Sequence, residues 1–571
     1  MRNKLLIQYT NLLEKIMRKN LIAGFLGLAL LLPTAGFAQA PAIKISADEK
    51  KAAEHITAKQ LSDYLYFVAS DEMEGRDTPS RGLDLTAKFL ATNLSRWGFK
   101  PAGDDGTFYQ KIALRRDAVD PAATSVDIGG QKFSYGDDLV RVSGTQTGTM
   151  TAKVVFAGNG WMIKSKGLNP YEGLDVKGKI IAVYGEGQPS QRSIVPMPAG
   201  VTQADLPNAG RGTEWADVAT YARANGAAGV LVLPSKFFAE NWSMISGSFG
   251  RNRLVVDKLA QAPPPAAAGA GPAPTVFIAS PKLANALFAG EAGNPLAGAT
   301  NSFSLNKDFT FSIGTKTETV WTQNVVALWE GSDPVLKSEM VAIGAHYDHV
   351  GVNPNAPGPD KIFNGADDDG SGTVAVLSIA EALAKTAKRP KRSVLLVWHC
   401  GEEKGLWGSE YFNKFPTVDI KKVTAQLNID MIGRSKKPGN TEPRDKDLSG
   451  ENTIYVIGKD MMSSTLGAVV DGTNKGYLNM DYDTRYDDPK DTNRFFFRSD
   501  HFNYAVNGIP IAFWFDGVHV DYHGAGDHPD KIDYARMEKI TRTIFLTLWQ
   551  LGNLKERPAV DKKLPPELSA R

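Results

Sequence analysis

The sequence predicts an α/β protein with a mostly parallel sheet flanked by helices, into which a smaller β-rich domain is inserted. The chain has 571 residues, which is too long for one ordinary domain. From Asn324 onward, apolar strands alternate with amphipathic helices, a pattern typical of a parallel sheet covered on both faces. From about Arg115 to Phe311, short β-rich runs are separated instead by Gly and Pro.

The first 40 residues are predicted to be a secretory signal peptide. The stretch "MRKNLIAGFLGLALLLPTAGFAQA" joins a basic start to a short apolar run and small residues around Ala38 and Ala40. Because this stretch has its own methionine and basic flank, we interpret the residues before Met17 as an overlong start. The apolar run is short for a membrane span and no second one follows, so we expect a periplasmic or secreted protein without a stable membrane anchor after cleavage.

Residues 41–114 are predicted to be largely helical, because apolar residues recur three and four positions apart from about Ile45 to Gly98. Ser46 is a predicted N-cap, and the pattern indicates two helices. In the β-rich segment, the low-complexity run Gln261–Pro274 predicts an exposed loop.

Charge and cysteine content exclude several classes of protein. The 65 basic and 63 acidic residues are balanced, and no basic run lies beyond the extreme N-terminus, so nucleic acid is not an expected partner. The single cysteine, Cys400, excludes an intrachain disulfide. Because it follows an apolar strand, we expect a small buried thiol rather than a nucleophile.

Acidic residues and histidines gather at the ends of the predicted strands. Taken singly, a strand-terminal Asp is usually a helix cap or a turn residue. Five clusters at the ends of successive elements would crowd carboxylates together, which requires cations to neutralise them. Histidine and carboxylate ligands without thiolate fit Zn²⁺, with Mn²⁺ or Co²⁺ less favoured. The clusters are His346 to His349, Asp367 to Asp369, Glu402 with Glu403, Asp430, and His519 to His528.

The motifs "GAHYDH", "NGADDDGSG", "GEEKGLWGS", "NIDM" and "YHGAGDHPDKID", in this order, resemble the M28 zinc aminopeptidase family, whose members carry a co-catalytic metal pair. The resemblance implies two Zn²⁺ ions, a peptide substrate and a bridging carboxylate followed by a cis peptide bond. The last motif departs from the family's usual "YHTxxD" at Gly524 and Ala525. Carried over residue by residue, the resemblance makes Asp367 the bridge, His346 and Asp430 ligands of one ion, and Glu403 and His523 ligands of the other.

The same resemblance gives Glu402 the role of general base. A carboxylate beside a metal-bridging water can take its proton and return it to the leaving amine. Adjacent glutamates can divide the work if the chain turns after its strand, so that Glu403 reaches metal while Glu402 reaches water. Asp348 is expected to orient the imidazole of His346 from behind, and Asp527 keeps its spacing in the last motif.

The segments "YEGLDVKGKIIAVYGEG" and "ARANGAAGVLVLP" resemble a protease-associated domain, which implies a role in shaping access to the active site or recognising substrate. Packing against the catalytic domain is the equal alternative. The predicted organisation is a signal peptide at 1–40, the N-terminal helical part of the catalytic domain at 41–114, the inserted domain at 115–311, the catalytic domain at 312–560 and a tail at 561–571.

The predicted function is a secreted or periplasmic di-zinc exopeptidase that hydrolyses N-terminal residues from peptides. One alternative is a carboxypeptidase of the glutamate carboxypeptidase type, which would need an arginine cluster; another is a non-catalytic scaffold built on the protease-associated domain. For Arg498 we expect an internal salt bridge rather than a substrate carboxylate. Several residues near the motifs are expected to be surface or supporting residues rather than ligands: His349, His519 and His528. The remaining arginines considered, too scattered to form a cluster, are Arg485 and Arg494.

Overall fold

The computed structural model describes residues 43–144, 146–185, 194–249, 253–260, 273–298 and 300–569. The predicted signal peptide and residues 261–272 of the predicted loop lie outside these ranges. Within them, no helix is long and apolar enough to cross a membrane. The chain divides into two compact units, one ending at Gln110 and resuming at Asn324, the other comprising residues 111–323. The boundaries predicted at residues 115 and 311 fall inside the second unit.

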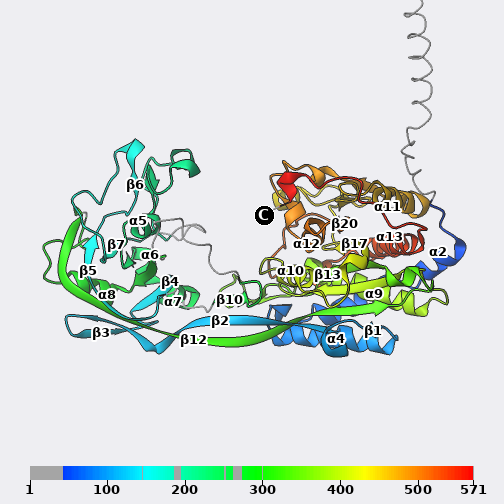
Figure 1. Ribbon diagram of the computed structural model, residues 1–571, viewed down its shortest axis with the longest axis horizontal. Coiled ribbons are helices and arrows are strands. Elements are labelled where there is room, and N and C mark those ends of the chain that lie inside the picture. Colours follow the sequence, from blue (N-terminus) through cyan, green and yellow to red (C-terminus); the bar gives the residue numbers. More distant parts are fainter. Residues whose placement is uncertain are drawn as a thin grey trace, which may run out of the picture. The chain divides into compact units, whose positions relative to one another are not determined.

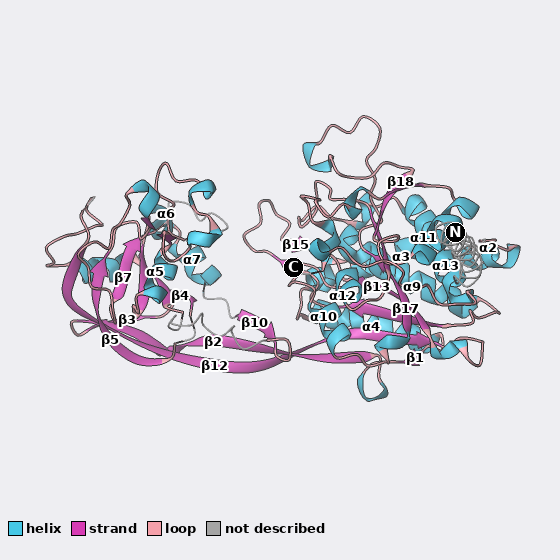
Figure 2. Cartoon of the chain, turned by 45° about the horizontal axis from the view of Figure 1, so that its top comes forward, coloured by secondary structure: helices cyan, strands magenta, loops and turns pink. Residues whose placement is uncertain are grey.

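The first unit confirms the predicted fold class, because its sheet is mostly parallel and flanked by helices (Figures 1 and 2). The strand order is β19-β18-β20-β17-β13-β16-β12. The pairs β13/β16, β13/β17, β17/β20 and β18/β19 are parallel, whereas β12 and β18 pair antiparallel with β16 and β20. The strands are β1 (Lys100–Pro101), β12 (Phe303–Trp329), β13 (Met340–His346), β14 (Gly351–Val352), β15 (Ile362–Phe363), β16 (Ser393–His399), β17 (Val423–Ile429), β18 (Thr453–Ile457), β19 (Asp481–Asp483) and β20 (Ile511–Phe515).

The three central strands, β13, β16 and β17, are buried along their whole length, as their continuous apolar sequences predict. Helices α9 and α13 pack against β13, while α10 and α12 pack against each other and against β16 and β17. This burial fixes the carboxyl ends of three neighbouring parallel strands side by side. The helices of this region are α9 (Gly372–Lys385), α10 (Trp407–Lys414), α11 (Ser464–Tyr477), α12 (His501–Val506) and α13 (Tyr534–Asn553).

The N-terminal part forms three helices where two were predicted: α2 (Ala47–Ala53), α3 (Ala58–Val68) and α4 (Arg81–Arg96). The predicted cap at Ser46 is confirmed, since its hydroxyl accepts from the backbone N–H of Glu49 and the Glu49 carboxylate accepts from the backbone N–H of Ser46. The extra helix arises because the Thr57 hydroxyl accepts from the backbone N–H of Gln60 and starts a new helix. A short 3₁₀ segment, η1 (Asp71–Arg76), follows α3.

In the second unit β5, β7, β9 and β11 are parallel neighbours, and β12 and β4 pair antiparallel with β5 and β11. Its core is a separate cluster of apolar residues that includes Val155, Val183 and Val232. Its strands are β2 (Tyr109–Ile128), β3 (Gln131–Ser134), β4 (Leu139–Ser143), β5 (Gly148–Phe156), β6 (Met162–Ile163), β7 (Ile180–Tyr184), β8 (Trp215–Ala216), β9 (Gly229–Leu233), β10 (Arg253–Val256) and β11 (Thr275–Ala279), and its helices are α5 (Val218–Ala224), α6 (Lys236–Glu240), α7 (Trp242–Phe249) and α8 (Pro281–Phe288).

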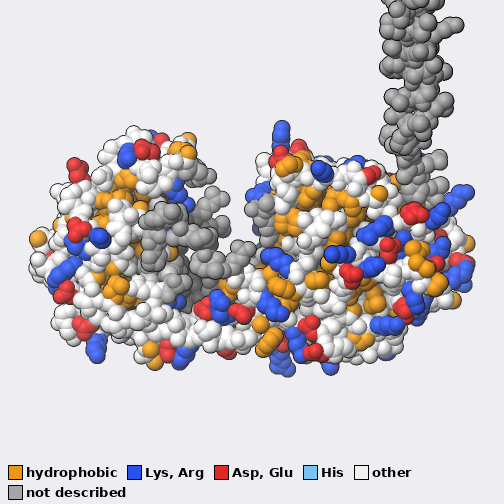
Figure 3. Space-filling view, in the orientation of Figure 1, with side chains coloured by type: hydrophobic (Ala, Val, Ile, Leu, Met, Phe, Trp, Pro, Cys, Tyr) orange, Lys and Arg blue, Asp and Glu red, His pale blue; other side chains and the backbone are white. Residues whose placement is uncertain are grey.

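The face drawn in Figure 3 carries basic and acidic side chains interspersed with one another. This mixture agrees with the balanced composition of 65 basic and 63 acidic residues. No stripe of one sign stands out on that face.

Candidate metal centre

The predicted site residues come from the carboxyl ends of the central strands. His346 is the last residue of β13, Glu402 and Glu403 follow β16, and Asp430 follows β17. Because β13 pairs in parallel with both β16 and β17, these side chains meet at one edge of the sheet. Asp368 reaches the same place from the turn that precedes α9.

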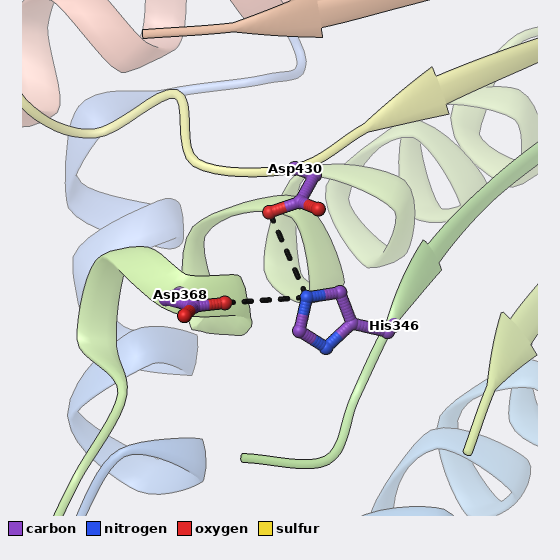
Figure 4. A group of neighbouring side chains, drawn as sticks. All are labelled: His346, Asp368 and Asp430. Carbon is purple, nitrogen blue, oxygen red and sulfur yellow. Dashed lines mark ion pairs between the residues drawn. The ribbon is translucent and has the colours of Figure 1, made fainter. Parts of the chain in front are cut away.

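Two groups of side chains in the described part of the chain could hold metal ions. In the first, Nε2 of His346 lies 3.3 Å from Oδ1 of Asp368 and 3.6 Å from Oδ1 of Asp430. Figure 4 shows both contacts converging on the same ring nitrogen. All three residues are buried, with exposed fractions of 6% or less. This group matches the His346 and Asp430 pair expected for one ion.

The second group consists of His349, Asp368 and Glu403. Nδ1 of His349 lies 2.9 Å from Oε1 of Glu403. His523 approaches the same carboxylates from its own loop: its Nε2 is 3.1 Å from Oδ2 of Asp368 and 3.0 Å from Oε2 of Glu403. Unlike His349, which is fully buried, the His523 side chain is 37% exposed. The Glu403 and His523 pair expected for the second ion is therefore brought together, with one more histidine beside it.

The expected bridge, Asp367, does not occupy the shared position, and this prediction is corrected: the residue common to both groups is Asp368. Oδ1 of Asp367 instead accepts from the backbone N–H of Gly433 at 2.7 Å. Asp369 is likewise occupied by backbone, accepting from Gly372 and Met431. The cis peptide bond joins Asp368 to Asp369, one bond later than expected. The side chains of Asp367 and Asp369 thus both bind the backbone that follows β17. The side chain of Asp368, between them, faces His346 and His523.

His349 is the donor that sequence reasoning missed, since it was expected to be a surface or supporting residue. It lies three residues beyond His346, in the loop after β13, and its ring meets that of His523 edge to face at 5.6 Å. The available signal was the "HYDH" spacing, which places a second histidine in the same loop as the first.

Asp527 supports the bridging turn from below. Its carboxylate accepts hydrogen bonds from the backbone N–H groups of Asp367 at 3.0 and 3.1 Å and of Asp368 at 3.1 Å. Its own carbonyl accepts from the N–H of Ala366 at 3.0 Å. These bonds fix the turn from which the Asp368 side chain projects.

Asp348 lies between the imidazole of His346 and the base candidate Glu402. The nearest hydrogen-bond acceptor for Nδ1 of His346 is the backbone carbonyl of Asp348 at 3.1 Å, while the Asp348 side chain lies 3.6 Å away, an ion-pair distance rather than a hydrogen bond. Oδ1 of Asp348 accepts from the backbone N–H of Glu402 at 3.2 Å. Asp348 therefore joins the loop after β13 to the loop after β16.

Arg76 clamps the same loops from the N-terminal part of the chain. Its guanidinium is fully buried and donates to four carbonyls: Tyr347 at 3.0 Å, Val68 at 2.6 Å, Asn364 at 2.7 Å and Gly365 at 2.8 Å. Two of these carbonyls belong to the turn just before the aspartates and one to the residue after His346. Nothing in the "DEMEGR" motif singles this arginine out, because its partners are backbone atoms.

Glu402 lines a pocket together with Asp368 and Asp430, and belongs to neither donor group. Its Oε2 lies 4.0 Å from Nε2 of His346. Burial raises the pKa of the Glu402 carboxyl well above its ordinary value; the charge of His346 opposes this rise and that of Glu403 adds to it. A carboxylate beside the donors with a raised pKa is suited to holding a proton.

The pKa of His523 is raised to about 10 in the metal-free protein. Burial acts to lower it, but the hydrogen bonds and charges of Asp368 and Glu403 outweigh burial. Since a metal ligand must be a neutral imidazole, metal binding at this position releases a proton.

The remaining predicted residues lie around the centre. Nε2 of His519 is 3.3 Å from Oδ2 of Asp367, and His528 pairs with Asp360 near the surface at 3.1 Å. Cys400 is fully buried, as expected. The expected salt bridge of Arg498 is absent among the described residues; its guanidinium lies over aromatic rings instead.

The candidate ligand atoms are suited to a metal ion because they lack hydrogen bonds of their own in the described part of the chain. Nε2 of His346, Oδ2 of Asp368 and Oε1 of Glu403 are buried, and although each lies within ion-pair distance of another member of the groups, none makes a hydrogen bond of good geometry among the described residues. Buried polar atoms without partners are costly unless something binds them. A mostly parallel sheet with histidine and carboxylate side chains at its carboxyl ends defines an α/β protein with a candidate metal site.

Residues 324–548 match the model of peptidase family M28. Leupeptin-inactivating enzyme 1 of Streptomyces exfoliatus is 26% identical over 251 residues, which cover 40% of this chain and 48% of that protein. A probable leucine aminopeptidase of Arthroderma otae is 30% identical over 229 residues, covering 38% of this chain and 56% of that protein. The chain spans about half the length of the curated relatives it matches.

Among solved structures, the aminopeptidase of Aneurinibacillus sp. strain AM-1 aligns with 91% of this chain and 98% of its own, at 17% identity and a TM-score of 0.46. A zinc aminopeptidase of Bacillus subtilis aligns with 89% of this chain and 99% of its own, at 17% identity and a TM-score of 0.45.

Proposed function

We propose that the chain is a secreted or periplasmic di-zinc exopeptidase that removes N-terminal residues from peptides. The observation that carries the proposal is the position of Asp368, whose Oδ1 faces His346 at 3.3 Å and whose Oδ2 faces His523 at 3.1 Å. A carboxylate shared by two donor groups suits a pair of metal ions. The family match supports peptide hydrolysis, and relatives named as leucine aminopeptidases support action at an N-terminus.

In this proposal, His346, Asp368 and Asp430 would hold one zinc ion, and Asp368, Glu403 and His523 the other, with His349 against Glu403. Bound zinc supplies Lewis-acid polarisation of the peptide carbonyl and acidifies water. Glu402 takes the proton of the attacking water and delivers it to the leaving amine, so it serves first as base and then as acid. The Asp348 carboxylate accepts a hydrogen bond from the backbone N–H of Glu402, which keeps the Glu402 carboxylate at the pocket wall.

The adjacent glutamates provide the experiment. Glu402→Gln should keep both zinc ions, measured by elemental analysis, and lose turnover of leucine p-nitroanilide by at least about 100-fold. Glu403→Gln should lose zinc. Retained turnover in Glu402→Gln would remove the base assignment, and a wild-type protein that binds no zinc would remove the proposal as a whole. A scaffold without activity is disfavoured because the donor set and Glu402 are all in place.

We assign residues 1–40 to export and residues 111–323 to substrate access. The first assignment expects the mature N-terminus to follow Ala40, and N-terminal sequencing of the exported protein tests it. The second rests on the likeness of this unit's sequence to protease-associated domains. It expects KM to change with peptide length in a leucine-initiated series, and a constant KM would count against it.

A further inference from the structure

The pocket beside the candidate metal centre has one basic residue in its wall, Arg498. It follows the 3₁₀ turn η11 (Phe495–Phe497) and faces the pocket that Glu402 and Asp430 line from the metal side. The other side of the wall is apolar and includes Phe513 and Phe515. One exposed cation, several aromatic rings and carboxylates of the candidate metal centre thus line the same pocket.

The guanidinium of Arg498 is held in place without an acidic partner. It lies 4.8 Å from the ring centroid of Phe495 and 5.7 Å from that of Tyr522, and Nη2 donates to the Tyr522 hydroxyl at 3.1 Å. No carboxylate among the described residues lies within ion-pair distance of it. Two other arginines of the first unit differ in this respect, since Arg434 pairs with Asp521 at 3.1 Å and Arg536 with Asp516 at 2.7 Å.

Such a group is suited to binding a carboxylate. A guanidinium presents planar pairs of N–H donors that match the two oxygens of a carboxylate, and aromatic faces hold its plane without neutralising its charge. With one hydrogen bond to a tyrosine, most of the donors of Arg498 are left for a ligand.

Tyr522 relates Arg498 to the metal centre. Its ring stacks on that of His523 with centroids 3.9 Å apart, and His523 in turn faces Asp368 and Glu403. The guanidinium is thus one aromatic ring away from a metal donor. A peptide whose scissile carbonyl lies at the metal centre would place a group of the adjoining residue near Arg498.

We propose that Arg498 is a specificity-determining residue that binds a substrate carboxylate within one residue of the scissile peptide bond. This inference rests on the proposed exopeptidase function and narrows its substrates to short peptides that combine an apolar side chain with a nearby carboxylate. The carboxylate has two possible sources: the C-terminal α-carboxylate of a dipeptide, or an acidic side chain next to the cleaved bond.

The experiment compares matched pairs of substrates on the zinc-loaded full chain. Leu-Gly against Leu-Gly-amide isolates the α-carboxylate, and Leu-Glu-amide against Leu-Gln-amide isolates the side chain. We expect one pair to differ by about 10- to 100-fold in kcat/KM, mainly through KM, as a charge-assisted hydrogen bond would give. Arg498→Gln should remove that difference, because kcat/KM falls much further for the carboxylate member of the pair than for its uncharged partner. Arg494→Gln, whose guanidinium lies over Phe497, is the control and should keep the difference.

Binding separates this inference from the proposed function. Calorimetric titration of the same four peptides into zinc-loaded Glu402→Gln protein reports carboxylate recognition without turnover. A wild-type protein that cleaves none of them, while this variant binds the carboxylate member more tightly, would overturn the exopeptidase proposal and keep the role of Arg498. Equal kcat/KM and equal binding within both pairs, or an equal loss for all four peptides in Arg498→Gln, would overturn the role of Arg498.

Discussion

Replacing Asp527 by Asn should weaken metal binding about 10- to 100-fold, because Asp527 holds the turn that presents Asp368. Its carboxylate accepts three hydrogen bonds from two backbone N–H groups, at 3.0 to 3.1 Å. An Asn side chain has one acceptor oxygen, and its amide N–H₂ group would face a backbone donor. With the amide oxygen at the Oδ2 position both N–H groups keep an acceptor, but the bond to Oδ1 is replaced by a donor facing a donor, and the remaining bonds lose the carboxylate charge, at a cost of about 1–3 kcal/mol.

The turn that carries Asp367 and Asp368 could reduce this cost by rotating so that its N–H groups reach water. Such a rotation would move the Asp368 side chain away from the histidines and weaken metal binding. A 10- to 100-fold loss of affinity corresponds to about 1.4–2.7 kcal/mol, the same range as the cost of the lost charge-assisted hydrogen bond. The loss of a negative charge near the ions acts in the same direction.

The assay is competition for zinc against a chromogenic chelator, with metal stoichiometry measured in parallel. Asp138→Asn is the matched control, because Asp138 is also buried and accepts from a backbone N–H, that of Ser134 at 2.9 Å, but lies in the second unit. Asp527→Asn protein that binds zinc within twofold of wild type would refute the reasoning, as would an equal loss in the control.

Three further outcomes are expected. Asp368→Asn should lose both ions, whereas Asp367→Asn should keep them while unfolding at lower urea; elemental analysis and urea denaturation distinguish the two, and the reverse result would restore Asp367 as the bridge. Arg76→Met should lower the free energy of unfolding of the first unit by about 3–5 kcal/mol, which is the cost of the orphaned carbonyls less the desolvation cost of the charge that is recovered. The measurement is the urea transition that shifts when zinc is added. Arg392→Met, at an equally buried arginine, is the control: it should lose a similar amount of stability without changing the affinity for zinc. Because the pKa of His523 is raised to about 10, its ion pairs stabilise the metal-free protein fully below about pH 6.5, and this stabilisation is lost as pH rises through about 10. The urea midpoint of the metal-free wild-type protein should therefore fall across this window, and His523→Gln should make the fall smaller. An equal fall of the midpoint with pH in the two proteins would contradict this.

Much of the centre could be predicted because strand ends in a parallel sheet are fixed by burial. Continuous apolar runs predict β13, β16 and β17, so the residues that follow them had to meet. The choice among three consecutive aspartates could not be made in this way. Side-chain direction there depends on the turn before α9, whose backbone is set by Asp527, a residue 160 positions away.

The contacts of Arg498 and His349 could not be predicted from the sequence for a related reason. Whether an arginine finds an acidic partner, or a histidine a carboxylate, depends on loops that meet only in the folded chain. Phe495 and Tyr522 give no sign in sequence that they hold a guanidinium between them. Such contacts have no periodicity, and the apolar pattern of the strands does not constrain them.

The Arg76 clamp also sets an order of events during synthesis. Its hydrogen bond to Tyr347 spans 271 residues, and the whole second unit lies between them in the sequence. At translation rates of about 5–20 residues per second, roughly 15 to 55 s pass before the partner carbonyls leave the ribosome. The second unit is continuous in sequence and is complete earlier, whereas three of the four carbonyls that accept from Arg76, those of Tyr347, Asn364 and Gly365, are made only after it. The early helices therefore depend on the last-made half of the chain to close the metal centre.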